Sequence, residues 1–131
     1  MEGAIGPVAG SSHHSLLNRM PGISIVSPMT PNEYILTYKH FMKNTDVIFV
    51  SEHRGSYDNK NELDDFISNN LDIILFPISI TRFEAQKAKL ILEKEGYKIG
   101  IANIFWIKPF VVKNEWKDAT FATEVYNVLC L

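Results

Sequence analysis

Cysteine is almost absent from this chain, because Cys130 is the single one among 131 residues. No disulfide can therefore form within the chain, and a zinc site built from several cysteines is excluded. Basic residues are also in slight deficit: 13 Lys and Arg stand against 15 Asp and Glu, which gives a net charge of −2. This balance disfavours the basic face that nucleic acids require, so we expect no nucleic-acid partner.

Long apolar runs are absent as well. Runs such as residues 47–50 and 73–78 fall far short of the roughly 20 residues that span a bilayer. The N-terminus carries Glu2 and no basic residue ahead of an apolar block, which is unlike a secretory signal. We therefore expect no membrane partner and a cytoplasmic location. The remaining composition, 46% hydrophobic and 21% charged, is typical of a globular protein with one core.

The first part of the chain predicts a strand, a helix and a second strand. Residues 1–21 are rich in glycine and serine, which favours a loop. Residues 23–27 are apolar and β-branched, and Pro28 ends the strand that they predict. Residues 46–51 predict the second strand. Strands joined by a helix with short links form a parallel βαβ unit.

The helix of this unit has a strong start signal. Thr30 is a capping residue, Pro31 suits the first helical position, and Glu33 follows three residues after the cap. The helix should end near Asn44 and bury one side. Its predicted buried stripe consists of Tyr34, Ile35, Tyr38, Phe41 and Met42.

The second part repeats this pattern after a polar segment. Residues 52–70 are rich in Asn, Asp, Ser and Gly, which predicts an interdomain linker with one short helical turn. Strands are predicted over residues 71–78 and 98–105. The helix between them starts with Thr81 as its cap and ends at Gly96. Its predicted buried stripe consists of Ala85, Ala88, Ile91 and Leu92.

Beyond Pro109 the pattern weakens to a short helix around residues 114–122 and a final strand at residues 125–131. The two βαβ units predict an α/β fold with parallel sheets. They share an architecture and are not sequence repeats.

Two groups of side chains are candidates for chemistry. His13 and His14 follow Gly10 in a loop that leads into a strand, where neutral imidazoles can donate, accept or shuttle a proton near pH 7. His53 and Arg54 follow the second strand at its C-terminal end, where open α/β sheets bind ligands, so Arg54 can meet an anionic group. The competing interpretations are solvated loop histidines or a tag remnant, and a surface ion pair in a linker.

Other site types find no support. Four histidines lack a carboxylate or cysteine at metal-ligand spacing, so we expect no metal site. The glycines at positions 3, 6 and 10 do not match G-x-G-x-x-G and follow no strand, which argues against a dinucleotide site.

Five stretches, in this order, resemble the transketolase-like family of thiamine diphosphate enzymes. Residues 10–15 (GSSHHS) and 21–28 (PGISIVSP) resemble the end of its pyrimidine-binding domain. Residues 72–77 (DIILFP), 85–96 (AQKAKLILEKEG) and 104–109 (IFWIKP) resemble the opening of the transketolase C-terminal domain. The family includes transketolases, 1-deoxyxylulose-5-phosphate synthases and the β subunits of 2-oxo acid dehydrogenases.

The resemblance implies a division of the chain. Residues 1–55 would end a pyrimidine-binding domain, residues 56–70 would be a linker, and residues 71–131 would begin an incomplete transketolase C-terminal domain. Between the histidines and Pro21, the family's helix is reduced to residues 15–20.

The resemblance also implies roles for single residues. A histidine in the family's glycine loop stabilises the oxygen that becomes charged as the cofactor adduct forms; His13 matches it slightly better than His14. Arg54 matches an arginine that binds the sugar phosphate in transketolases, whereas residues 52–57 resemble a stretch of dehydrogenase β subunits. We therefore expect catalytic roles for His13 and His14, and substrate binding by Arg54 and His53.

The implied activity is transfer or oxidative removal of a two-carbon or acyl unit from a ketose or a 2-oxo acid, with thiamine diphosphate and magnesium. The glutamate that activates the cofactor would precede Met1, and the Gly-Asp-Gly and Asn that hold magnesium and diphosphate belong to another domain or subunit. We therefore expect no cofactor on this chain alone. A companion chain or domain would supply the diphosphate-binding half within a homo- or hetero-oligomer.

A function of another class also fits the sequence: a non-catalytic α/β module that binds a protein through its exposed sheet edge and Trp106. A small flavodoxin-like binding domain is a weaker alternative, because its phosphate loop is absent. Loss of activity in an assembled complex on His13→Ala would separate the enzyme from the module.

Overall fold

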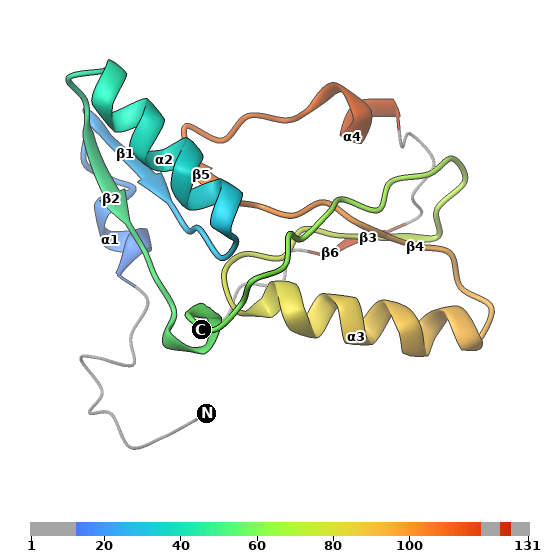
Figure 1. The fold of residues 1–131 in the computed structure, drawn as a ribbon. Helices are drawn as coiled ribbons and strands as arrows, with labels where there is room; N and C mark the ends of the chain where they lie inside the picture. The colour runs from blue at the N-terminus through green and yellow to red at the C-terminus, as the bar shows by residue number, and fades with distance from the viewer. Residues whose placement is uncertain (1–12, 119–123, 127–131) are drawn as a thin grey trace.

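The computed structural model describes residues 13–118 and 124–126 as two three-stranded sheets with helices packed on them (Figure 1). The strand order is β2-β1-β5 in the first sheet and β4-β3-β6 in the second. Each sheet contains a parallel strand–helix–strand unit, so the predicted α/β fold with two such units is confirmed. Within the described part of the chain, no helix is long and apolar enough to cross a membrane.

The first sheet is built around β1 (Ile23–Val26). It pairs in parallel with β2 (Val47–Val50) along all four residues, and α2 (Pro31–Lys43) connects the two. On its other side β1 pairs antiparallel with β5 (Trp106–Lys108), which the sequence did not predict as a strand. The later part of the chain thus returns to complete the first sheet.

The second sheet is built around β3 (Ile73–Leu75). It pairs in parallel with β4 (Ile99–Ile101), and α3 (Thr81–Lys94) connects them. On its other side β3 pairs in parallel with β6 (Glu124–Tyr126), which overlaps the predicted final strand. The rest of that predicted strand, Cys130 included, lies outside the described residues.

Three short helical segments complete the structure. Helix α1 (His14–Leu17) is a single turn within the segment predicted as a loop. The 3-10 turn η1 (Arg54–Ser56) is the short helical turn predicted in the polar segment after β2. Helix α4 (Asn114–Asp118) begins where the sequence predicts it, and residues 119–122 of the prediction lie outside the described residues.

The start of α2 is confirmed in its details. Thr30 caps the helix, and its hydroxyl accepts a hydrogen bond from the Glu33 N–H at 3.4 Å. The Glu33 carboxylate accepts one from the Met29 N–H at 2.9 Å. Two backbone donors at the helix start are thereby satisfied by side chains.

The predicted cap of α3 is wrong, because the capping position belongs to Ile80 and Thr81 is the first helical residue. The Thr81 hydroxyl points back along the chain: it accepts from the Ile78 N–H at 3.0 Å and donates to the Ile78 carbonyl at 2.6 Å. The threonine therefore stabilises the turn before the helix instead of capping the helix itself.

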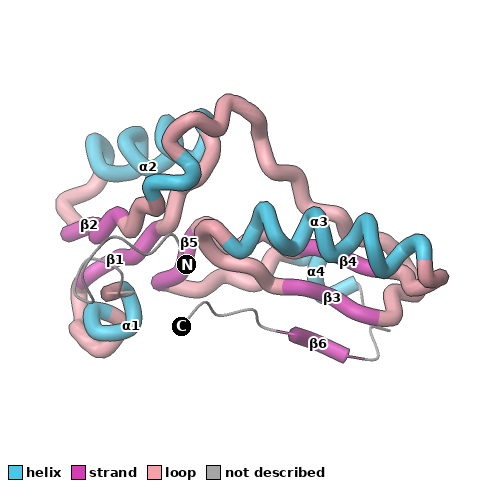
Figure 2. The backbone as a smooth tube through the Cα atoms, turned by 90° about the horizontal axis from the view of Figure 1, so that it is seen from below, coloured by secondary structure: helices cyan, strands magenta, loops and turns pink. Residues whose placement is uncertain are grey.

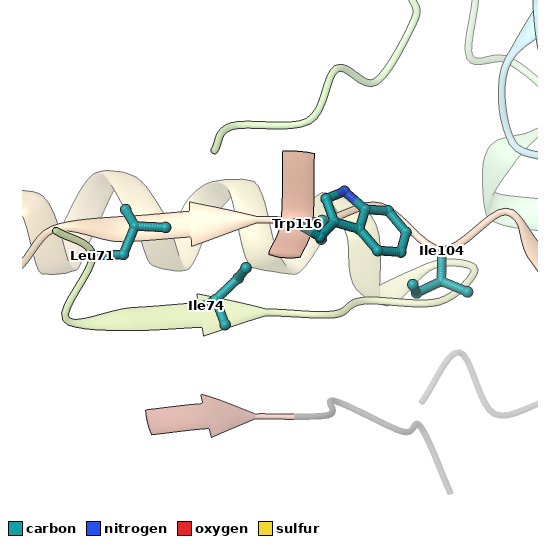
Figure 3. Close-up of a cluster of buried hydrophobic side chains, with 5 residues drawn as sticks. Leu71, Ile74, Ile104 and Trp116 are labelled. Atoms are coloured by element: carbon teal, nitrogen blue, oxygen red, sulfur yellow. The ribbon is translucent and has the colours of Figure 1, made fainter. Parts of the chain in front are cut away.

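Two apolar clusters occupy opposite faces of the second sheet, as alternate side chains of β3 require. Ile74 belongs to the cluster with Trp116 (Figure 3), and Leu75 to the cluster beneath α3. Ala85 and Leu92 of α3 pack on the second cluster as predicted, but Ile91 is 59% exposed. The complete buried sets are Leu71, Ile74, Ala102, Ile104 and Trp116, and Leu75, Ala85, Ile99 and Ile101.

The predicted buried stripe of α2 is also wrong. Four of its five members are exposed, while Thr37, which was not in the stripe, is 3% exposed. His40 faces the sheet as well, and its ring meets Trp106 edge to face with centroids 4.8 Å apart. The predicted stripe is turned toward solvent because polar contacts fix the opposite side of α2 against the sheet. The exposed members are Ile35, Tyr38, Phe41 and Met42.

One buried ion pair connects the two helices. Arg82 is fully buried at the start of α3, and its guanidinium donates to both Glu33 carboxylate oxygens, at 2.8 and 2.7 Å. Its Nε donates to the Asn103 side-chain oxygen at 3.1 Å. A bidentate arginine–carboxylate pair is a strong and directional contact.

Asn103 extends this pair into a network. Its side-chain amide donates to the Asp64 carbonyl at 2.7 Å, and its N–H donates to the Asp65 carboxylate at 2.7 Å. The other Asp65 oxygen accepts from the Trp116 indole at 3.1 Å and from Lys113 at 2.6 Å. The network thus runs from α2 through α3 to α4.

We predict that Arg82→Ala lowers the free energy of unfolding by about 3–5 kcal/mol, because the Glu33 side chain, only 13% exposed, loses its charge partner. Lys87→Ala is the matched control, since Lys87 pairs with Glu84 on the surface of the same helix, with side chains 68% and 66% exposed. Its cost should stay below about 1 kcal/mol. Urea denaturation measures both, and equal losses would contradict the structural role of the Arg82 pair.

Candidate functional site

The carboxyl edge of the first sheet is the candidate site. Because β1 and β2 are parallel, the segments that follow both strands emerge at the same edge. The Ser51 N–H donates to the Val26 carbonyl at 2.8 Å, and the Ser27 hydroxyl donates to the Ser51 carbonyl at 3.0 Å. These bonds hold the two segments together where the sequence predicts substrate binding.

His53 and Arg54 lie directly after this junction. The His53 ring nitrogen Nδ1 accepts a hydrogen bond from the Gly55 N–H at 3.0 Å, and the His53 carbonyl accepts one from the Ser56 hydroxyl at 2.7 Å. An accepting Nδ1 means that the neutral ring carries its proton on Nε2. Arg54 begins η1 with an exposed side chain.

Tyr34 and Glu52 add a further contact at this edge. Burial raises the pKa of Tyr34, and its hydrogen bond and charge repulsion with Glu52 raise the pKa further. The phenol therefore stays protonated and acts as a donor to the Glu52 carboxylate. The sequence placed Tyr34 in a core stripe and did not predict this contact.

His13 and His14 lie at α1, on the side of β1 away from α2 (Figure 2). His13 is exposed, and its carbonyl accepts from the N–H groups of Leu16 and Leu17 at 3.2 and 3.4 Å. His14 is half-buried, and this burial lowers its pKa below the usual 6.5. Residues 10–12 of the motif lie outside the described residues.

A groove of about 310 Å³ lies at the edge of the second sheet where β3 and β4 begin. It is not part of this site. It is lined by residues near the starts of β3 and β4 and the end of α3, among them Leu71, Lys89 and Lys98. Ligands of open α/β sheets bind beyond the carboxyl ends of the strands, which is the opposite edge. Across residues 13–118 and 124–126, no three His, Cys, Asp or Glu side chains gather to hold a metal ion.

Sequence reasoning also missed the buried groups behind the site. Arg82, which also donates to Asn103, holds Glu33 at the start of α2, one residue from Tyr34. The pair joins positions 49 residues apart, and neither partner carries a local signal of burial. Only the three-dimensional arrangement identifies them.

Comparison with solved structures identifies the architecture. A transketolase variant from Pichia stipitis superposes with a TM-score of 0.69 and 18% identity, over 88% of this chain. The fold is that of part of a transketolase. Another transketolase variant from Pichia stipitis, in complex with fructose 6-phosphate, gives the same TM-score and identity. A split-gene transketolase, described as an inactive β4 tetramer, gives a TM-score of 0.64 and 16% identity over 86% of this chain.

The likeness covers only part of those proteins. This chain spans 19% of the Pichia stipitis transketolases and 40% of the split-gene chain. Models of known protein families give no match to the sequence, and no curated protein matches it. The transketolase-like resemblance drawn from the sequence is thus confirmed at the level of fold.

We predict that His14 makes the protein less stable in acid. Because burial lowers its folded-state pKa, the unfolded chain binds more protons than the folded chain as the pH falls below 6.5, and the free energy of unfolding falls. Between about pH 8 and about pH 5, wild type should lose more stability than His14→Gln, as measured by urea denaturation at each pH.

Ser15→Ala, which removes no titrating group from the same short helix, serves as the control and should keep the wild-type pH dependence. Parallel stability curves for wild type and His14→Gln would contradict the prediction.

Proposed function

We propose that this chain forms part of a thiamine diphosphate-dependent enzyme of the transketolase-like class, acting on a ketose or a 2-oxo acid. The fold is the observation that carries the proposal, because 88% of the chain superposes on a transketolase with a TM-score of 0.69. The edge that holds Glu52, His53 and Arg54 supports it, since ligands of α/β sheets bind at such edges.

His13 is the proposed catalytic residue, with His14 as the alternative. In this role an imidazole N–H donates to the substrate's carbonyl oxygen as negative charge builds up on it, which is where a positioned donor accelerates a reaction most. The lowered pKa of His14 favours a neutral ring, which can both donate and accept. His13 keeps the better match to the family motif.

Arg54 and His53 are the proposed substrate-binding residues. The Arg54 guanidinium would pair with a phosphate or carboxylate of the substrate through two parallel hydrogen bonds. Because His53 Nδ1 is engaged by Gly55, its Nε2–H is the group left to donate to substrate oxygen. The similarity of residues 52–57 to dehydrogenase β subunits favours a 2-oxo acid over a ketose.

Bound thiamine diphosphate would supply a carbon nucleophile for the substrate carbonyl and an electron sink for the resulting charge. We assign contacts with the substrate to the imidazole of His13 or His14 and to the guanidinium of Arg54. We assign magnesium and the diphosphate to a companion chain or domain. The split-gene transketolase among the structural neighbours supports such an arrangement.

A second function remains in view: a non-catalytic module that binds another protein. The observation that favours it is the row of exposed apolar side chains on α2, from Ile35 at 50% to Met42 at 79% exposed. Proteins seldom leave such rows open to water.

Native mass spectrometry of the protein purified gently from its source cells tests the proposal. We expect a complex that contains a second chain and thiamine diphosphate. In that complex His13→Ala should lower kcat by about 10²–10³-fold, the usual cost of removing one oxyanion donor. A larger loss for His14→Ala would transfer the catalytic role to His14.

Arg54→Ala should raise KM for the anionic substrate, whereas Arg19→Ala, an exposed arginine just after α1, serves as the matched control and should leave KM unchanged. A free chain without cofactor, or a complex whose activity is untouched by both histidine substitutions, would overturn the proposed enzymatic role.

A further inference from the structure

The outer side of α2 carries an apolar stripe that no part of residues 13–118 and 124–126 covers. Ile35, Tyr38 and Met42 are 50%, 66% and 79% exposed, and their i, i+3, i+7 spacing places them on one line along the helix. Phe41, 53% exposed, borders the line. This is the periodicity that a helix uses to pack against another element.

The side of α2 that faces the protein is polar instead. Glu33 binds Arg82, Thr37 donates to the Glu33 carbonyl at 2.8 Å, and His40 packs on Trp106. At about 100° per residue, this side lies roughly 160° around the helix from the stripe. The helix is therefore amphipathic with its apolar side outward, which indicates a surface that another element covers.

Positive charge flanks the stripe. Lys39 and Lys43 are exposed, lie one turn apart and follow the same edge of the stripe. Within the described residues neither ammonium group takes part in an ion pair. The only carboxylate on α2, Glu33, is already bound to Arg82.

We propose that this surface, consisting of Ile35, Tyr38, Met42, Lys39 and Lys43, binds an amphipathic helix of a companion chain. The partner helix would lay apolar residues at i, i+3 or i+4, and i+7 along the stripe. Asp or Glu residues beside them would pair with the two lysines. Apolar area supplies the affinity, and the charges set orientation and partner choice.

A second copy of this chain is a poorer occupant. Two-fold symmetry with antiparallel α2 helices brings the same flank of both helices together, so Lys39 would face the partner's Lys43. Like charges across an interface disfavour association. A lipid surface is also a poorer occupant, because membrane-binding helices carry a richer basic face and the chain has a net charge of −2.

The inference stands on α2 alone and is independent of the catalytic proposal. A chain that lacks thiamine diphosphate chemistry would still expose the same stripe. If no thiamine diphosphate is found in the native complex, the proposal for α2 still stands. If the crosslinking experiment fails, the proposed catalytic roles of His13 and His14 are unaffected.

Site-specific photo-crosslinking of the full chain in its source cells tests the surface. A photoreactive amino acid replaces Met42, and the cross-linked peptide is identified by sequencing. We expect a segment of a different chain with the helical apolar spacing and at least one Asp or Glu beside it. A cross-link to a second copy, to lipid, or to a segment without acidic residues, or no cross-link at all, overturns the proposal.

Charge reversal provides the second readout. Lys39→Glu combined with Lys43→Glu should lower the cross-linking yield by about tenfold, because two attractive pairs become repulsive. Lys60→Glu combined with Lys94→Glu makes the same change in net charge at exposed positions elsewhere and should leave the yield unchanged. Equal losses for both double variants would show that only net charge matters and would also overturn the proposal.

Discussion

The structure depends on one buried contact, the bidentate pair between Arg82 and Glu33. A fully buried guanidinium is tolerable only when it is paired and hydrogen-bonded, and here the carboxylate and Asn103 engage one donor on each of its three nitrogens. The need to pair this guanidinium determines the position of more than Arg82 and Glu33. The first turns of α2 and α3 must meet, which places the first and second sheets relative to each other, and Asn103 in turn fixes the segment at Asp64 and Asp65. The polar segment after β2 is thus held by side-chain hydrogen bonds, together with the backbone pairing of Phe66 with Ile101 and the packing of Ile67 on the core.

The orientation of α2 follows from the same contact. Because Glu33 must face Arg82, the residues one and two turns later on that side, Thr37 and His40, also face inward. The apolar stripe is then turned outward, however well its spacing suits burial. Tyr34 lies between the two sides and reaches Glu52, so a single helix contributes to the internal network, to the candidate site and to the outer surface. Because α2 makes all three kinds of contact, its apolar side does not face the protein interior as it does in most amphipathic helices.

The two strand–helix–strand units could be predicted because their signals are local: Thr30, Pro31 and Glu33 mark one helix start, and buried strands show as short apolar runs. The position of His53 and Arg54 was predictable for the same reason, since they follow a strand end. The outward stripe of α2 was not, because periodicity identifies an amphipathic helix without saying what covers it. Arg82 could not be predicted as a buried residue, because it lies in what looked like a capping pattern. Strand β5 could not be predicted either, because it forms by pairing with β1 and its three residues carry no strand signal of their own.

The fold of this chain resembles that of transketolases at only 16–18% sequence identity. Such a similarity of fold does not require the same side chains at the site. Ladder hydrogen bonds and helix packing tolerate most side-chain changes, so the architecture persists while the loops at the sheet edge vary. In this chain the loop after β2 is nevertheless fixed by local hydrogen bonds: the Ser51 N–H donates to the Val26 carbonyl, and the Gly55 N–H donates to the His53 ring. A loop anchored in this way holds the His53 ring through its Nδ1, directly before Arg54 in the chain. The place of His53 and Arg54 therefore follows from two parallel strands that end together, whatever the side chains in the loop.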